Sequence, residues 1–273
     1  KVDASIADNW TNGNKKITLT GSDETGSWID KFYVTNNLNY VPNQLDFNIA
    51  ATEGIGYVNE DVGTYKVFTI DKVGNISDGK IIEVKNVDKV GPISLNPVSA
   101  TTWTRDTYSI SFGCSSDSKT GCMDKITYSI IDETNNKTLV SETKDTKSIN
   151  YTFQASDGSV IRSSKITWTI YDNLGNQTVQ DGYIINVFID KQAPSCTSSG
   201  GNSSWTNYDI NLLGQCNDGL GSGCQGNVTK SYTSNIETYN QSPGNVSDKI
   251  GNVAQCPANQ TVKIDKTAPT CTT

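Results

Sequence analysis

Short runs in which apolar and polar residues alternate are the main structural signal along this chain. These runs lie at residues 17–20, 32–35, 65–70, 108–112, 126–130 and 165–170. A period of two predicts β-strands that bury one face, and clusters of Gly, Asn and Asp bound each run as turns do. No long stretch has the 3.6-residue period of an amphipathic helix. The pattern therefore predicts an all-β fold, and several short strands per unit favour antiparallel sandwiches.

The chain also repeats itself. An Asp-x-x-Gly-Asn signature begins at Asp71, Asp172 and Asp248. A second signature, Asp-Lys-x-Gly/Ala-Pro, follows it and begins at Asp88, Asp190 and Asp265. A tryptophan starts each unit, at Trp10, Trp103 and Trp205, and an aspartate follows 13, 14 and 13 residues later, at Asp23, Asp117 and Asp218. Such regular spacing predicts a tandem array of homologous domains at residues 1–91, 92–193 and 194–273, the last including the start of a further repeat.

Composition excludes several functions. The net charge is −7 and no stripe of Lys and Arg exists, which argues against nucleic-acid binding. No apolar run approaches the ~18 residues that span a bilayer. The chain contains no histidine, which removes Ser-His and Cys-His machinery, and no phosphate-binding loop or cofactor fingerprint is present. We therefore expect a protein that is not an enzyme, with adjacent repeats of a longer chain as its first partners.

Seven cysteines follow the repeats. Cys114 and Cys122 lie eight residues apart in the second repeat and either bond to each other or stay reduced. Cys216 and Cys224 occupy the equivalent places in the third repeat. Homology of position therefore pairs them and leaves Cys196 to pair with Cys256. Cys271 matches Cys196 of a following unit. A zinc site is the alternative, but the spacing is unsuitable and no histidine completes a ligand set. Disulfides imply an oxidising compartment.

The two signatures and the strand between them resemble the bacterial immunoglobulin-like (Big-type) repeats of large surface proteins and adhesins. Residues 23–26, 117–121 and 218–223 resemble that family's Asp-x-x-Ser-Gly turn before strand C. The resemblance covers essentially the whole chain and implies a tandem array of antiparallel Ig-like β-sandwiches. The third is shortened, with 43 residues from Trp205 to Asp248 against 61 and 69 in the other units, and is stapled by disulfides. Ser242-Pro243-Gly244 interrupts its expected strand F.

The family topology also implies a metal site. It brings the Asp-Gly turn, the Gly-Asn turn and the preceding unit's Asp-Lys pair to one pole of each sandwich. Two groups of aspartates then meet, namely Asp88 with Asp117 and Asp172, and Asp190 with Asp218 and Asp248. Carboxylates together with turn carbonyls suit Ca²⁺, which takes six to eight oxygens. The alternative is that Lys89 and Lys191, or hydrogen bonds from water and turn N–H groups, neutralise these carboxylates.

For function, the resemblance implies a stalk or spacer at the bacterial cell surface, an extracellular and monomeric rod that presents a head domain. An adhesive module that binds a host glycan or protein is the alternative, and accessory repeats of a phage structural protein or secreted enzyme are a weaker one. The tryptophan that starts each unit predicts a core or junction plug. Trp28 and Trp168 do not recur, which makes them candidates for a surface contact.

Overall fold

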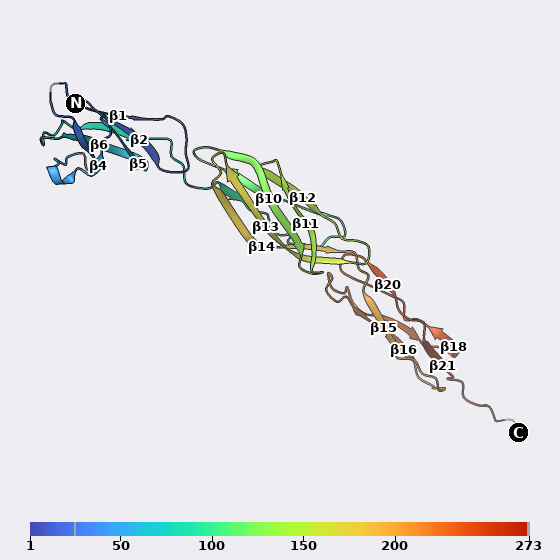
Figure 1. The fold of residues 1–273 in the computed structure, drawn as a ribbon. Helices are drawn as coiled ribbons and strands as arrows, with labels where there is room; N and C mark the ends of the chain where they lie inside the picture. Colours follow the sequence, from blue (N-terminus) through green and yellow to red (C-terminus); the bar gives the residue numbers. More distant parts are fainter. Residues whose placement is uncertain (25, 272–273) are drawn as a thin grey trace. The chain divides into compact units, whose positions relative to one another are not determined.

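The computed structural model describes residues 1–24 and 26–271 (Figure 1). The chain divides into two compact units. Unit 1 contains Lys1–Ser94, Cys114–Lys125 and Ile170–Thr178, and unit 2 contains Leu95–Gly113, Ile126–Thr169 and Val179–Thr273. Among the described residues the only helix is the 3-10 turn η1(Gln44–Asp46), and no helix is long and apolar enough to cross a membrane. The fold is all-β, as the alternating pattern predicts.

The first ninety residues form two antiparallel sheets around one core. The first sheet has the order β1(Val2–Ile6), β2(Lys15–Gly21), β5(Ile55–Glu60). The second has the order β4(Ile49–Ala50), β3(Ile29–Thr35), β6(Gly63–Asp71), β7(Lys80–Val84). Ile17 and Leu19 of β2 pack in one buried cluster with Phe32 of β3 and Val67 of β6. The predicted runs at 17–20, 32–35 and 65–70 all lie in strands, and β2 buries alternate side chains as a period of two requires. β6 differs, because residues 67–70 are all buried, with Val67 in this cluster and Phe68 and Ile70 in a second cluster on the other face with Phe47.

Residues 93–190 form two more sheets, and the boundary between the two units passes through several of their strands. One sheet has the order β11(Lys137–Lys144), β10(Cys122–Asp132), β13(Val160–Asp172), β14(Gln177–Asp190). The other has the order β12(Ser148–Phe153), β9(Tyr108–Ser116), β8(Ile93–Leu95). In unit 2, Trp168 is fully buried, with its ring centroid 5.2 Å from that of Phe112. The prediction of a surface role for Trp168 is thus wrong, because its register in β13 points the indole into the core.

The last eighty residues, in unit 2, form three small antiparallel sheets. Their strand orders are β15(Ser195–Ser199), β16(Ile210–Asn217), β17(Val228–Tyr232), then β18(Ile236–Gln241), β21(Gln260–Ile264), and β19(Asn245–Ser247), β20(Val253–Gln255). The strand predicted to be interrupted at Pro243 is split there, since β18 ends at Gln241 and β19 begins at Asn245. A cluster of only four fully buried side chains lies here, namely Ile210, Leu212, Val262 and Ile264.

Three disulfides are present, in the pairs expected from the repeats. They join Cys114 to Cys122, Cys216 to Cys224 and Cys196 to Cys256, while Cys271 is free and exposed. By the loop-entropy relation the short rings stabilise the fold by about 2.6 kcal/mol each, and the Cys196–Cys256 ring by about 4.3 kcal/mol. The largest contribution therefore falls beside a small hydrophobic cluster.

The repeated tryptophans differ in their surroundings. Trp103 is half-buried and stacks on Phe188 with ring centroids 5.0 Å apart. Trp10 and Trp205 are among the exposed large side chains, so the expectation of a core plug is wrong for both. Trp205 has Lys263 over its ring where Trp103 has Phe188. Trp28, 74% exposed, lies at the surface as expected.

Candidate functional site

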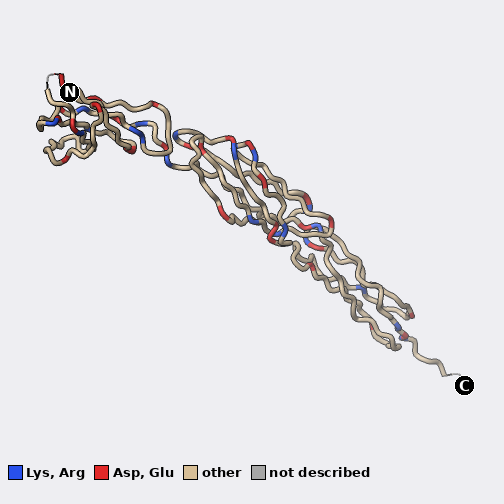
Figure 2. Tube along the Cα trace, viewed as in Figure 1, with Lys and Arg blue, Asp and Glu red and all other residues tan. Residues whose placement is uncertain are grey.

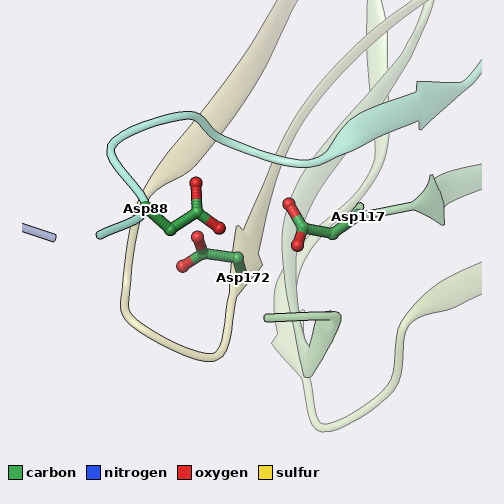
Figure 3. A group of neighbouring side chains, drawn as sticks. All are labelled: Asp88, Asp117 and Asp172. Carbon is green, nitrogen blue, oxygen red and sulfur yellow. The ribbon is translucent and has the colours of Figure 1, made fainter. Parts of the chain in front are cut away.

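The structure brings the six predicted aspartates together in two triads. The first triad is Asp88, Asp117 and Asp172, all in unit 1, and the second triad is Asp190, Asp218 and Asp248, all in unit 2. In each triad, one carboxylate oxygen per residue lies within 4.8 Å of the other two. Figure 3 shows the three carboxylates of the first triad turned toward one another. Elsewhere the charges of the described residues are mixed, with Lys and Arg interspersed among Asp and Glu (Figure 2).

The Asp-x-x-Gly-Asn signature forms a tight turn that fixes one member of each triad. Asp172 ends β13, and its Oδ1 accepts the N–H groups of Leu174 at 2.9 Å and Asn176 at 2.8 Å. Gly175 has a φ of +87°, a conformation that favours glycine. The Asn176 side-chain amide donates to Asp172 Oδ2 at 2.7 Å and to the Asp88 carbonyl at 2.9 Å. The signature is therefore a structural turn that also holds a second triad member in place.

The second triad repeats this arrangement. Asp248 Oδ1 accepts the N–H groups of Ile250 at 3.0 Å and Asn252 at 2.8 Å. The Asn252 side-chain amide donates to Asp248 Oδ2 at 2.6 Å and to the Asp190 carbonyl at 3.2 Å. The two triads thus share the same supports, which explains why both Asp and Asn recur at constant spacing.

The threonines that follow Trp10 and Trp103 hold the segments that carry Asp88 and Asp190. Sequence reasoning missed this role. The Asp88 N–H donates to the Thr11 carbonyl at 2.9 Å, and the Asp190 N–H donates to the Thr104 carbonyl at 2.9 Å. Thr11 and Thr104 also form parallel bridges with the residues preceding these aspartates. The recurring Trp-Thr dipeptide is the sequence signal for this contact, but a backbone hydrogen bond leaves no side-chain pattern that identifies its partner.

The loops that carry Asp117 and Asp218 differ. Asp117 Oδ1 accepts three backbone N–H groups, from Lys119 at 3.0 Å, Thr120 at 2.7 Å and Gly121 at 2.9 Å. Burial would raise the pKa of Asp117, but these hydrogen bonds outweigh it and leave the pKa below its ordinary value. The Asp117 carboxylate is therefore well satisfied by its own loop.

Asp218 is less well satisfied. Its Oδ2 accepts the Gly223 N–H at 2.6 Å, whereas its Oδ1 is buried without a hydrogen-bond partner. Burial raises the pKa of Asp218, and the carboxylates of Asp190 and Asp248 raise it further, against the Gly223 hydrogen bond. Ser222 donates its N–H to Asp190 Oδ2 at 2.7 Å, but its buried Oγ has no partner. Asp218 is 8% and Ser222 7% exposed, so water does not readily satisfy these atoms.

The neutralising lysines considered from the sequence do not reach the triads. The Lys89 ammonium binds Asn14 at 2.6 Å and Asp61 at 2.7 Å, and the Lys191 ammonium lies 3.9 Å from Asp157. Over the described part of the chain, no lysine or arginine nitrogen lies within 4.0 Å of a carboxylate oxygen of the second triad. Three buried carboxylates without a counter-charge are unfavourable, and a hard cation with oxygen ligands fits them.

Gly221 packs directly against two of these carboxylates. Gly221 has no side chain, and a Cβ there would collide with Asp190 Oδ2 and lie 2.7 Å from Asp218 Oδ2. A glycine at this position therefore lets the Asp190 and Asp218 carboxylates approach the loop backbone, and it places no charged side chain beside them. The residues that would hold a cation are Asp190, Asp218 and Asp248, with the Ser222 hydroxyl nearby.

No protein-family model and no curated protein matches this chain. Among solved structures, a Ca²⁺-stabilised adhesin that helps an Antarctic bacterium bind ice matches 99% of this chain and 75% of its own, with 15% identity and a TM-score of 0.38. A tetra-tandem repeat from the extending region of a large adhesion protein matches 98% of this chain and 74% of its own, with 15% identity and a TM-score of 0.35.

Domains A168–A170 of titin also match, over 69% of this chain, with 13% identity and a TM-score of 0.35. This chain spans 65% of the length of that titin fragment. The matched structures thus include bacterial adhesin repeats and a segment of several consecutive domains. Each of these structures has a TM-score below 0.5 to this chain.

Proposed function

We propose that this chain is a non-catalytic, extracellular repeat segment of a bacterial surface protein that acts as a stalk and presents a head domain. Its units would be the three sequence repeats at 1–91, 92–193 and 194–273. The three disulfides support an oxidising, extracellular setting. We expect the segment to be monomeric, with neighbouring repeats as its structural partners.

The observation that carries this proposal is the set of structural contacts that the repeated residues make. The repeated Asp and Asn form turns and join segments, the repeated Cys close rings, and Thr11 and Thr104 anchor the chain beside the triads. A catalytic or ligand-binding protein would keep some repeated polar residues for a substrate. Here Asn176, Asn252, Thr11, Thr104 and the paired cysteines all take part in contacts that hold the fold together, as a spacer requires.

We further propose that the second triad holds Ca²⁺. The Asp218 Oδ1 and Ser222 Oγ atoms, both buried and unpartnered, support this assignment. When bound, the ion would neutralise carboxylates at the end of β14 and in two later loops, and would thereby tie these three places together. Asn252, which already links two of these segments, would keep the carboxylates in place.

Small-angle scattering tests the stalk. A compact protein of 273 residues would have a radius of gyration of about 19 Å. A stalk predicts a clearly larger value that does not change with protein concentration. A radius near the compact value, or a mass of a stable oligomer, would contradict the proposal.

The adhesive alternative is favoured by one surface in unit 2. Trp205 is 57% exposed and Tyr239 is similarly exposed, and the Lys263 ammonium lies 5.9 Å and 5.2 Å from their ring centroids. Exposed aromatic rings beside polar groups suit a sugar, whose apolar face can stack on a ring. A glycan array tests this alternative. Binding that is lost in Trp205→Ala and kept in Trp28→Ala would favour adhesion, and an array without binding would favour the stalk.

A further inference from the structure

The two triads differ at one position of their loops. Counted back from the second cysteine of each loop, Lys119 before Cys122 corresponds to Gly221 before Cys224. The neighbouring residues also correspond, because Gly121 and Gly223 both have positive φ, at 80° and 91°. The loops are thus alike beside the cysteine and differ in whether a lysine or a glycine faces the carboxylates.

Lys119 brings a positive charge to the first triad. Its ammonium donates to the Val87 carbonyl at 3.0 Å and lies 3.8 Å from Asp88 Oδ1. The Asp88 side chain is almost completely buried, so this ion pair has one well-desolvated partner. The Thr120 hydroxyl also donates to Asp88 Oδ2 at 3.2 Å. Both oxygens of Asp88 therefore have partners from the same loop, and the triad already contains a cation.

The second triad lacks these partners. Gly221 supplies no side chain, and the Ser222 hydroxyl, which corresponds to Thr120, is unpartnered. Lys249 follows Asp248, but its ammonium lies near Gly223 and forms no ion pair within 4.0 Å among the described residues. In the second triad, an external cation would bind three carboxylates that have no lysine or arginine counter-charge among the described residues. In the first triad it would have to displace an ammonium that belongs to the chain.

We propose that the Lys119 ammonium serves as the cation of the first triad and prevents Ca²⁺ from binding there. Gly221 supplies no such charge, so the second triad binds one Ca²⁺. The inference rests on the calcium site proposed above and specifies which of two similar triads is regulated by the metal. Unit 1 is then held together at its triad without calcium, and unit 2 depends on calcium at the equivalent place. The residue before Thr120 or Ser222 determines this difference.

Calorimetric titration of the full chain with CaCl₂ tests the inference, after removal of metal with a chelator. We expect one ion per chain, lost in Asp218→Asn and kept in Asp117→Asn. Lys119→Gly should bind a second ion, and adding Asp117→Asn to that variant should remove it. Lys119→Arg keeps the positive charge, and Lys89→Ala removes an ammonium that faces Asp61. Both should still bind one ion.

A second variant tests Gly221 itself. Gly221→Ala should weaken calcium binding by about 10- to 100-fold, because its Cβ would collide with the Asp190 and Asp218 carboxylates and displace them. Melting curves without calcium verify that each variant folds. Binding of two ions by the unaltered chain, or of one ion by Lys119→Gly, would overturn the role of Lys119 alone. No binding by the unaltered chain would overturn the calcium site itself, and one ion removed by Asp117→Asn alone would overturn both.

Discussion

The side-chain amide of Asn176 bridges the Asp172 carboxylate and the backbone carbonyl of Asp88, two residues that are 84 positions apart in the chain. One amide therefore connects the end of the first sequence repeat to a turn of the second. Asn252 makes the same pair of bonds to Asp248 and Asp190 in unit 2. This recurring amide links the local turn of each repeat to the segment before it.

The first prediction concerns these amides. Asn252→Ala should lower the free energy of unfolding by about 1–3 kcal/mol, because it leaves buried acceptors without a donor. Asn75 is the matched control, since its side chain bonds Asp71 in the same turn but makes no other described bond and is exposed. Asn75→Ala should cost less than Asn252→Ala. Urea denaturation measures both, and equal losses would show that the link to Asp190 contributes nothing.

The second prediction concerns the disulfides. Replacing Cys196 and Cys256 by Ser should destabilise the protein by about 4 kcal/mol, against about 2.6 kcal/mol for Cys114 and Cys122. The longer ring restricts the unfolded chain more, and the hydrophobic cluster beside it is small. Differential scanning calorimetry should show the larger loss in a transition of the last eighty residues. Peptide mapping without reductant should recover Cys271 as a free thiol, and recovery of Cys196 linked to Cys216 would contradict the pairing.

The third prediction concerns metal removal. Calcium at about 100 times its dissociation constant should stabilise the site by about 2.7 kcal/mol through ligand linkage. Melting curves recorded in chelator and in millimolar calcium should therefore differ in the unaltered protein. The difference should vanish in Asp218→Asn, with Asp181→Asn as a control carboxylate away from both triads. Identical curves in both conditions would leave hydrogen bonds and disulfides as the only supports of the second triad.

The fourth prediction concerns the tryptophans. Trp168→Ala should cost about 3–5 kcal/mol, because it empties a large volume in a closely packed core. Trp28→Ala should change stability by no more than about 0.5 kcal/mol, as is usual for exposed positions. Chemical denaturation of both variants measures the contrast. A small effect of Trp168→Ala would mean that the indole is not a core residue.

The sequence by itself determined the features that arise from local interactions. An aspartate that bonds the N–H groups two and four residues later, as Asp172 does, needs only its own turn, and such turns recur wherever the signature recurs. Alternation of apolar residues located the main strands because pleating places neighbours on opposite faces. Repetition paired the cysteines, since equivalent positions of homologous units have equivalent surroundings.

Tertiary structure alone decided what each repeated position faces. Trp168 is buried and Trp205 exposed although both are tryptophans near strands, because packing of the opposite sheet, and not composition, determines which face is covered. Lys89 adjoins Asp88 in sequence yet pairs with Asp61, while Lys119 reaches Asp88 from 31 residues away. A side chain's charge is visible in sequence, but its partner depends on how loops from distant segments pack.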